Sequence, residues 1–340
     1  MRSQPASMRD VAHRAGVSLS TVSRVLRGAP GVAPEVRRRV QHAADELSYV
    51  VSRNASGLVT GRTGRVAVIV PFLQPWFFGV ALSGISDALR EADLDMLVYQ
   101  VGETRAREGW TRALPLRRNT DAVITVSMDL SEEECQRLDD VGVPMVLVGQ
   151  CAPGRASVYI DDRAGTAGAT QHLLNLGHTR IAYIGSRREE WSSGSSRHRL
   201  EGYEAGMAAA GLTPWSVSKA TGRTGGELAM GELLSDRDPP TAVLAEFDGL
   251  AMGAHRILRR SGVRVPESIS LMGFDNHDAA AVLDLTTVDQ APYDIGLTAG
   301  RLTVGVLDGT ARSDSHVEMP TQIILRQSTA SPRGSRGLSS

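Results

Sequence analysis

The sequence predicts an α/β protein in which a short helix-turn-helix domain precedes two doubly wound parallel-sheet subdomains. Three observations support this fold class. The first 50 residues contain three short amphipathic segments, the remainder alternates apolar runs with amphipathic stretches, and positive charge is concentrated near the N-terminus. With 340 residues, 41% hydrophobic and 22% charged, the chain can form two or three domains with sizeable cores.

The N-terminal segment contains three predicted helices. Met8–Ala15 places its apolar residues on one helical face, and a glycine follows it. Ser18 is a favourable N-cap for a second helix, Leu19–Leu26, whose valines share one face. A third helix is expected to begin at Pro34, because proline is favoured at the first helical position.

Two short helices joined by a glycine-containing turn, and closed by a third helix, form a helix-turn-helix. Because the second helix buries its valines, its polar face is free to enter a DNA major groove. Arg24 suits a bidentate contact to guanine, and Ser20 suits a base edge. The short donors Ser18, Thr21 and Ser23 suit phosphates. A plain three-helix bundle with a solvated polar face is the alternative.

Charge divides the chain unevenly. The net charge is −1, but residues 1–62 carry ten arginines and four acidic residues, a charge of +6, which leaves −7 on the remainder. A basic segment joined to an acidic body is typical of a nucleic-acid-binding module attached to another domain. A chance cluster of surface charge is the alternative.

From Gly64 onward, short apolar runs bounded by Gly, Pro or Asp alternate with amphipathic stretches. The predicted strands are 64–71, 95–101, 121–127, 144–150, 180–186, 241–247 and 268–274. The clearest helical stretches are 79–94, 167–178, 201–212 and 249–262. This alternation predicts parallel sheets built from βαβ units, in two doubly wound subdomains. The pattern alone does not distinguish an enzyme from a binding protein.

Catalytic and metal-binding motifs are missing from the sequence. Lys219 is followed by Ala220, which excludes a P-loop, and neither G-x-S-x-G nor H-E-x-x-H occurs. Cys135 and Cys151 cannot form a disulfide framework or a cysteine metal cluster. We therefore expect no metal and no cofactor. Without an apolar span or a secretory signal, we expect a cytoplasmic protein that makes no membrane contact.

The run DVAHRAGVSLSTVSRVLRG, residues 10–28, resembles the N-terminal signature of the LacI/GalR family of bacterial transcription regulators. The following VAPEVRRRVQHAADELSYV is similar to the third helix of that family, and the DNA-binding domain would span residues 8–50. The resemblance implies that Leu19, Ser20 and Arg24 read bases. Because Leu19 is apolar, it could contact only a thymine methyl or another apolar edge.

The resemblance also implies a hinge at residues 51–63, which folds into a helix on DNA and inserts a leucine into the minor groove. Asn54 and Leu58 are the hinge residues expected to contact DNA. Gly57 is one of three departures from the family pattern, and glycine weakens a helix. We therefore expect a hinge helix that forms only on the operator. A linker or core role for Leu58 is the alternative.

Further motifs resemble the periplasmic-binding-protein-like core of the family, among them LGHTRIAYIG, RLEGYEAGM and LMGFDN, and the whole resemblance covers about residues 8–329. It implies an effector-binding and dimerisation domain, 64–329, with a cleft between two subdomains and three chain crossings. The subdomains are expected at about 64–160 with 290–318 and at about 162–287 with 320–329, the crossings near 160–162, 286–290 and 318–322. Residues 1–7 and 330–340 are expected to be disordered.

The same resemblance assigns residues to the effector site. Phe78 would stack on the ligand, Arg199 of RLEGY would fix a polar group, and Asp275 of GFDN would accept hydrogen bonds. Weaker candidates are Asp161, Trp191, Ser195 and Phe247. Phe247 stands where many members have a polar residue, which makes the pocket more apolar. A structural salt bridge between Arg199 and Asp275, and core packing of Phe78, are the alternatives.

Together these features predict a homodimeric, sequence-specific DNA-binding regulator, expected to be a repressor. It would bind a near-palindromic operator in double-stranded DNA, and its affinity would change when a small-molecule effector, expected to be a carbohydrate, binds in the cleft. A solute-binding receptor with the same body fold is the main alternative, although it would not need the helix-turn-helix. A doubly wound enzyme is the other.

Overall fold

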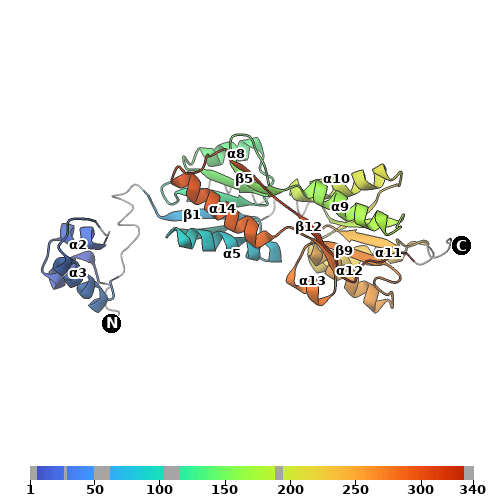
Figure 1. Cartoon of the computed structure of the whole chain (residues 1–340), viewed down its shortest axis with the longest axis horizontal. Helices are drawn as coiled ribbons and strands as arrows, with labels where there is room; N and C mark the ends of the chain where they lie inside the picture. Colours follow the sequence, from blue (N-terminus) through green and yellow to red (C-terminus); the bar gives the residue numbers. More distant parts are fainter. Residues whose placement is uncertain (1–5, 27–28, 50–61, 103–114, 188–193, 333–340) are drawn as a thin grey trace. The chain divides into compact units, whose positions relative to one another are not determined.

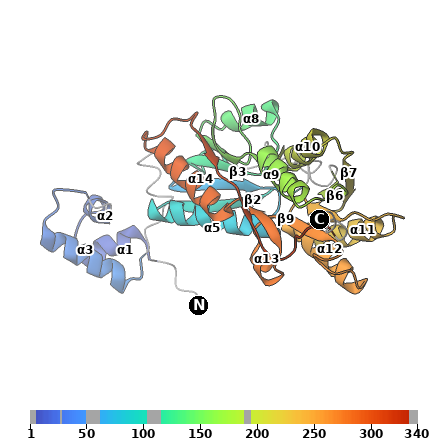
Figure 2. The same ribbon diagram turned by 45° about the vertical axis from the view of Figure 1, so that its right-hand side comes forward.

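The structure is a computed structural model that describes residues 6–26, 29–49, 62–102, 115–187 and 194–332. The chain forms two compact units, residues 1–64 and 65–340. Figures 1 and 2 show the helices and strands of each unit in two views. Most of the predicted hinge, with Asn54 and Leu58, and the predicted effector residue Trp191 lie outside the described residues.

The N-terminal unit contains the three helices that the apolar periodicity predicts. They are α1 (Met8–Ala15), α2 (Leu19–Leu26) and α3 (Pro34–Glu46). Their apolar faces meet in one cluster, in which Val11, Val22 and Val40 are fully buried. Gly16 ends α1 in the left-handed conformation, with φ of 62°, which glycine adopts without steric cost. The predicted helix-turn-helix fold is confirmed.

The expected disorder of residues 1–7 is wrong for Ser7. The backbone amide of Asp10 donates to the Ser7 hydroxyl at 3.4 Å, and the Ser7 amide donates to the Asp10 carboxylate at 2.7 Å. This reciprocal capping box satisfies donors that the first turn of a helix leaves without intrahelical partners. Ser7 therefore belongs to the ordered start of α1.

The first subdomain of the core is built on a six-stranded parallel sheet in the order β11-β5-β4-β3-β1-β2. Its strands are β1 (Arg65–Val70), β2 (Asp95–Gln100), β3 (Ala122–Val126), β4 (Met145–Val148), β5 (Ala156–Ile160) and β11 (His316–Met319). Along β1, Val66 and Val68 pack on one face of the sheet, whereas Ala67 and Ile69 pack on the other. Burial of both faces explains the continuous apolar run in this strand.

Helices α5 (Trp76–Glu91) and α14 (Pro292–Leu307) lie side by side over one face of this sheet, and α8 (Glu132–Asp139) lies over the other (Figure 1). Glycine allows the close approach of α5 and α14. A Cβ atom on Gly84 would lie 2.1 Å from the carbonyl oxygen of Tyr293. The two backbones are therefore in direct contact, and a larger residue at this position would force the helices apart.

The second subdomain is built on another six-stranded sheet, in the order β12-β10-β9-β8-β6-β7. Its strands are β6 (Ile181–Ser186), β7 (Trp215–Lys219), β8 (Ala242–Ala245), β9 (Ser270–Asp275), β10 (Thr286–Asp289) and β12 (Gln322–Ile324). Strand β12 pairs antiparallel with β10 at the edge of this sheet, whereas the other strand pairs are parallel as predicted. Between β10 and β12 the chain passes through α14 and β11 of the first subdomain, and it enters β12 directly from β11.

Two helix pairs cover the second sheet (Figure 2). Helices α9 (Asp162–Asn175) and α10 (Gly194–Ala209) pack together over one face, and α11 (Gly222–Leu234) and α12 (Asp248–Arg260) over the other. A short helix, α13 (Asp278–Val282), follows β9. The predicted architecture of two doubly wound subdomains is confirmed.

The chain crosses between the subdomains three times. The crossings follow Ile160 at the end of β5, Asp289 at the end of β10 and Met319 at the end of β11. The second crossing lies at the end of the expected range 286–290, because residues 286–289 still form a strand of the second sheet. The first subdomain is therefore assembled from two separate parts of the chain.

The C-terminal tail was expected to be disordered from residue 330, but Ala330 is still bonded to the core. The backbone amide of Ala330 donates to the Ser270 hydroxyl at 3.0 Å, and its carbonyl oxygen lies 2.8 Å from Nε2 of His178. Both partners are buried in the second subdomain. Ala330 is consequently fixed to the core, whereas residues 333–340 lie outside the described part of the chain.

Candidate functional site

The polar face of α2 carries the residues predicted to contact DNA. Ser18, Ser20 and Arg24 are exposed, and the side chain of Leu19, an apolar residue, is 46% exposed. The valines of the same helix point into the cluster shared with α1 and α3. Packing therefore separates an apolar inner face from an outer face that a nucleic acid can reach.

Local hydrogen bonds organise this outer face. The amide of Thr21 donates to the Ser18 hydroxyl at 3.2 Å, so Ser18 caps α2 as predicted. That hydroxyl also lies 2.8 Å from the hydroxyls of Ser20 and Thr21. Arg24 donates to the carbonyl oxygen of Pro30 at 3.1 Å. A guanidinium has five N–H donors, so Arg24 keeps donors for a base while this bond holds its side chain.

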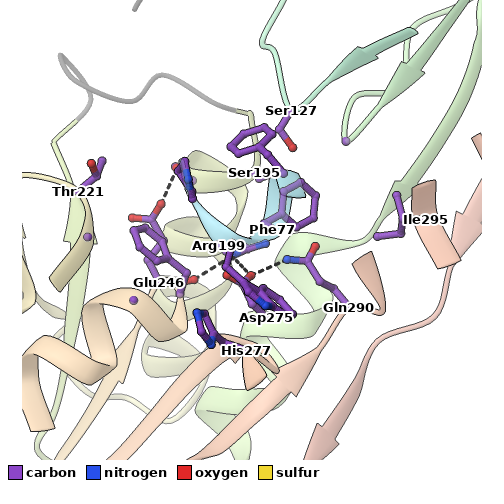
Figure 3. Close-up of a pocket in the computed structure, with 18 of the residues that line it drawn as sticks. Phe77, Ser127, Ser195, Arg199, Thr221, Glu246, Asp275, His277, Gln290 and Ile295 are labelled. Carbon is purple, nitrogen blue, oxygen red and sulfur yellow. Dashed lines mark hydrogen bonds and ion pairs between the residues drawn. The ribbon is translucent and has the colours of Figure 1, made fainter. Parts of the chain in front are cut away.

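A cavity of about 770 Å³ lies between the two core subdomains. Its polar residues follow the carboxyl ends of strands, as Ser127 follows β3, Glu246 follows β8 and Gln290 follows β10, and Asp275 ends β9. Open α/β sheets bind ligands at this edge. Here two such edges face one another, because both sheets contribute to a single cavity (Figure 3).

Arg199 of α10 is the centre of the polar floor. Its Nε donates to Asp162 at 2.7 Å, and its Nη1 donates to the backbone carbonyl oxygen of Glu246 at 2.9 Å. A longer ion pair of 3.5 Å joins Nη1 to Asp275. The guanidinium also lies over the ring of Phe274, 3.7 Å from its centroid. Burial acts to lower the pKa of Arg199, but Asp162 and Asp275 raise it above its ordinary value, so the residue stays charged.

Asp275 connects this floor to the crossing between β10 and α14. Gln290 donates to its Oδ1 at 2.5 Å, and Gln290 is itself only 4% exposed. Burial raises the pKa of Asp275 to about 6, although Arg199 and the hydrogen bond from Gln290 act in the opposite direction. At neutral pH the group is therefore mostly a carboxylate and can accept hydrogen bonds from a ligand.

Glu246 is a second buried acceptor in the cavity, and the sequence analysis missed it. It is 3% exposed, and its carboxylate accepts hydrogen bonds from the Ser186 amide at 2.6 Å and the Ser196 hydroxyl at 2.5 Å. Figure 3 shows Arg199 between Glu246 on one side and Asp275 with Gln290 on the other. The cavity thus has two acidic positions separated by one guanidinium.

Aromatic rings form much of the apolar wall. Phe77 and Phe78 meet edge to face, with centroids 5.4 Å apart, and Phe247 also lines the cavity. Phe78 is only 1% exposed and belongs to the apolar core, which favours the core-packing alternative, although it still borders the cavity. Phe77 and Phe247 are half-buried and offer more surface for stacking.

Trp76 closes one side of the cavity by bridging the subdomains. It begins α5 of the first subdomain, and its indole N–H donates to Asp278 of the second at 3.1 Å. Its ring stacks on that of His277 with centroids 4.8 Å apart. Burial lowers the pKa of His277, so this ring is mainly neutral at pH 7. A ligand inside the cavity would lie behind this contact.

The structure brings five predicted effector residues to the cavity: Phe78, Ser195, Arg199, Phe247 and Asp275. Asp161 is not among the lining residues. It is exposed, and its carboxylate caps α9 by accepting from the Ala164 amide at 2.8 Å. The neighbouring Asp162 is the acid that pairs with Arg199. Two successive acidic residues stand at the start of α9, and only one of them can cap the helix. The sequence could therefore have indicated that Asp161 caps α9 and that Asp162 is left to pair with another residue.

No set of three or more potential metal ligands occurs among the residues that the structure describes. Within the same residues, no helix combines the length and apolar character needed to cross a membrane.

A helix-turn-helix domain followed by two doubly wound subdomains around a cavity defines the class of DNA-binding transcription regulators with a periplasmic-binding-protein-like core. Residues 7–52 match the family described as bacterial regulatory proteins, lacI family, and residues 170–329 match a periplasmic binding protein-like domain. Catabolite control protein A of Priestia megaterium is 30% identical over 327 residues, which cover 94% of this chain and 98% of that protein. The chain belongs to the LacI family of bacterial transcriptional regulators.

Two solved structures illustrate the similarity. The Lac repressor dimer bound to operator and the anti-inducer ONPF has a TM-score of 0.87 at 25% identity, covering 96% of this chain and all of that one. A complex of the transcriptional regulator CelR with cellobiose has a TM-score of 0.70 at 29% identity, covering 95% and 99%. The predicted family, fold class and regulatory function are confirmed.

Proposed function

We propose that this chain is a homodimeric, cytoplasmic repressor whose affinity for a near-palindromic operator changes when a carbohydrate or carbohydrate derivative binds in the core cavity. One observation carries the effector assignment: aromatic surfaces and hydrogen-bonding groups converge between the two subdomains. Phe77 and Phe247 offer flat apolar surface, whereas Arg199, Asp275 and Gln290 offer donors and acceptors for hydroxyls. The cellobiose complex of CelR, a relative of similar length, supports the same ligand class.

The operator-binding face would be the outer side of α2. Arg24 and Ser20 would contact base edges, Leu19 a thymine methyl, and Ser18, Thr21 and Ser23 the phosphates. The exposure of Leu19 supports this assignment, because an apolar side chain gains from leaving water. Two copies of the chain, related by a twofold axis, would occupy the two halves of the operator.

Effector binding and operator binding would be linked through the position of the two subdomains. A ligand that contacts both sides of the cavity favours one relative position of the sheets. If the same position favours or disfavours operator binding, each ligand must change the affinity of the other by an equal factor. This proposal gives the three crossings a function, because they allow the subdomains to move while keeping them connected.

The DNA-binding part is tested by selecting operator sequences from random double-stranded DNA with the full chain. We expect two related half-sites. The Arg24→Ala variant should lose about 1–3 kcal/mol of specific binding and relax the preference at one base pair of each half-site. Binding to non-selected DNA is the matched control, since it should change much less. An unchanged base preference would show that Arg24 does not read a base.

The effector part is tested by a thermal-shift screen of mono- and disaccharides, nucleosides and purines, followed by an operator-binding titration with the best ligand. We expect a carbohydrate to raise Tm, and the Asp275→Ala variant to lose that rise. The same carbohydrate should change operator affinity. Ligands that bind without changing operator affinity would contradict the coupling, and a best ligand outside the carbohydrates would contradict the ligand class.

A further inference from the structure

Among the residues that the structure describes, buried carboxylates outnumber buried guanidinium groups at the floor of the cavity. Glu246 and Asp275 line the cavity together with Arg199, and Asp162 lies outside the lining as the ion-pair partner of Arg199. The side chains of Asp162 and Arg199 are only 4% and 9% exposed. Arg223, which also lines the cavity, is exposed on α11 and therefore screened by water. His277 is mainly neutral at pH 7, as its lowered pKa requires.

Glu246 is the cavity carboxylate that forms no ion pair with a described residue, although the charge of Arg199 also acts on it. The hydrogen bonds that its oxygens accept from described residues come from neutral donors, the Ser186 amide and the Ser196 hydroxyl. Arg199 donates to the backbone carbonyl of Glu246, while its Nε is occupied by Asp162. Within the described part of the chain, no Arg, Lys or His forms an ion pair with Glu246, whose carboxylate still has lone pairs available.

Two further polar atoms beside Glu246 lack hydrogen-bond partners among the described residues. They are the hydroxyl oxygens of Tyr183 and Ser186, both buried. A Cβ atom on Gly185 would lie 3.4 Å from Oε2 of Glu246 and 3.0 Å from the ring of Tyr183, so the tyrosine ring and the carboxylate are neighbours. Neither residue lines the cavity, so Glu246 is the acceptor in this group that a ligand would reach.

A ligand that fills the cavity removes water from this floor. A neutral ligand would leave the excess negative charge desolvated, at a cost that rises steeply as water is excluded. A protonated nitrogen would offset the charge on Glu246 and donate up to three hydrogen bonds. The aromatic wall also favours a cation, since the faces of Phe77 and Phe247 attract positive charge.

We propose that the effector carries a protonated amine that binds the carboxylate of Glu246, so that the ligand class is an amino sugar rather than a neutral sugar. This inference rests on the proposed function, because it takes the cavity to be a carbohydrate site. Arg199, Asp275 and Gln290 then bind hydroxyls at one end of the ligand. Glu246 and Ser196 bind the ammonium at the other.

The test compares matched sugars on the full chain by titration calorimetry. The probes are glucosamine, glucose and N-acetylglucosamine, together with the corresponding β-1,4-linked disaccharides. A charge-assisted hydrogen bond predicts that the amine-bearing sugar binds about 10- to 100-fold more tightly than its hydroxyl or acetylated counterpart. The Glu246→Gln variant, which keeps the side-chain size and an oxygen acceptor, should reduce this preference to about twofold. Glu227→Gln is the control that should leave it unchanged, because Glu227 is a half-buried acid that pairs with Arg256 and does not line the cavity.

A second measurement does not depend on any variant folding. The amine loses its proton as the pH rises from about 6 to about 9, so the preference over the parent sugar should fall toward unity. The parent sugar serves as the reference, because titration of Asp275, His277 or other cavity groups affects both ligands.

The outcomes separate this inference from the function on which it rests. If neutral sugars bind as tightly as their amine counterparts, or if the amine preference survives in Glu246→Gln, the amino-sugar inference is overturned while the carbohydrate effector stands. If no sugar of either kind binds, the proposed effector class fails, and the inference fails with it.

Discussion

Removal of the guanidinium at Arg199 should destabilise the core strongly, because it would leave two buried carboxylates without their cation. We consider Arg199→Met, which keeps an unbranched apolar side chain of similar length. The variant loses the 2.7 Å bond to Asp162, the 2.9 Å bond to the Glu246 carbonyl and the ion pair with Asp275. Breaking a buried pair by removing one partner costs about 3–5 kcal/mol.

The free energy of unfolding is measured by urea denaturation of the full chain, followed by circular dichroism. Arg256→Met is the matched control, since Arg256 pairs with Glu227 on the surface and its side chain is 57% exposed. That change should cost less than about 1 kcal/mol. Adding Asp162→Asn to Arg199→Met removes one uncompensated charge and should recover at least about 1 kcal/mol. The reasoning is refuted if Arg199→Met costs no more than Arg256→Met, or if the second substitution recovers nothing.

Two further predictions concern the elements that support the cavity. Burial, with a contribution from Asp275, raises the pKa of Asp248 to about 8, so the folded protein retains a proton that the unfolded chain releases near pH 4. The stability that this group contributes is therefore present at low pH and lost as the pH rises toward 8. In the Asp248→Asn variant, the unfolding free energy should decline less steeply between about pH 5 and 7, by about 1.4 kcal/mol per pH unit. Equal slopes of unfolding free energy against pH in the two proteins, measured by urea titration, would contradict this. Gly84→Ala should lower unfolding free energy by about 1–3 kcal/mol, because its methyl group would meet the Tyr293 carbonyl. Gly79 lies on the same helix, and a Cβ atom added there would have no neighbouring atom within 4 Å. Gly79→Ala should therefore be neutral or stabilising by up to about 1 kcal/mol. Similar Tm changes in the Gly84 and Gly79 variants would contradict the close packing of α5 against α14.

The sequence predicted those helices and strands in which the spacing of apolar residues matches the burial of the same residues in the fold. Helix α2 has its valines at helical spacing and its cap at Ser18, and both features survive in the fold. The central strands were recognisable because both of their faces are buried, which requires an uninterrupted apolar run. Five strands were not predicted, namely β5, β7, β10, β11 and β12. The edge strands β7, β11 and β12 mix exposed with half-buried or buried residues, whereas β5 and β10 are largely buried but short, and polar residues interrupt their apolar runs.

The site shows the same division. Arg199 and Asp275 were identified through motifs, and their pairing was considered as an alternative. Their other partners, Asp162, Glu246 and Gln290, were not identified, because a motif does not state which side chain a long-range contact will select. The bond between Arg199 and Asp162 joins residues 37 positions apart, and the one between Ser196 and Glu246 joins residues 50 apart. Glu246 could have been found from its place after an apolar strand, since such positions meet at the ligand-binding edge of a parallel sheet.

The discontinuous first subdomain has a consequence for synthesis on the ribosome. Its central sheet is complete except for β11 once Ile160 has been made, but α14, which packs beside α5, ends at Leu307. At about 5–20 residues per second, the 147 intervening residues take roughly 7–30 s to translate. During that interval the apolar side of α5 and the adjacent sheet lack their cover. The nascent chain therefore exposes an apolar surface while 147 of its 340 residues are translated, and we expect it to depend on chaperones far more than the finished regulator does.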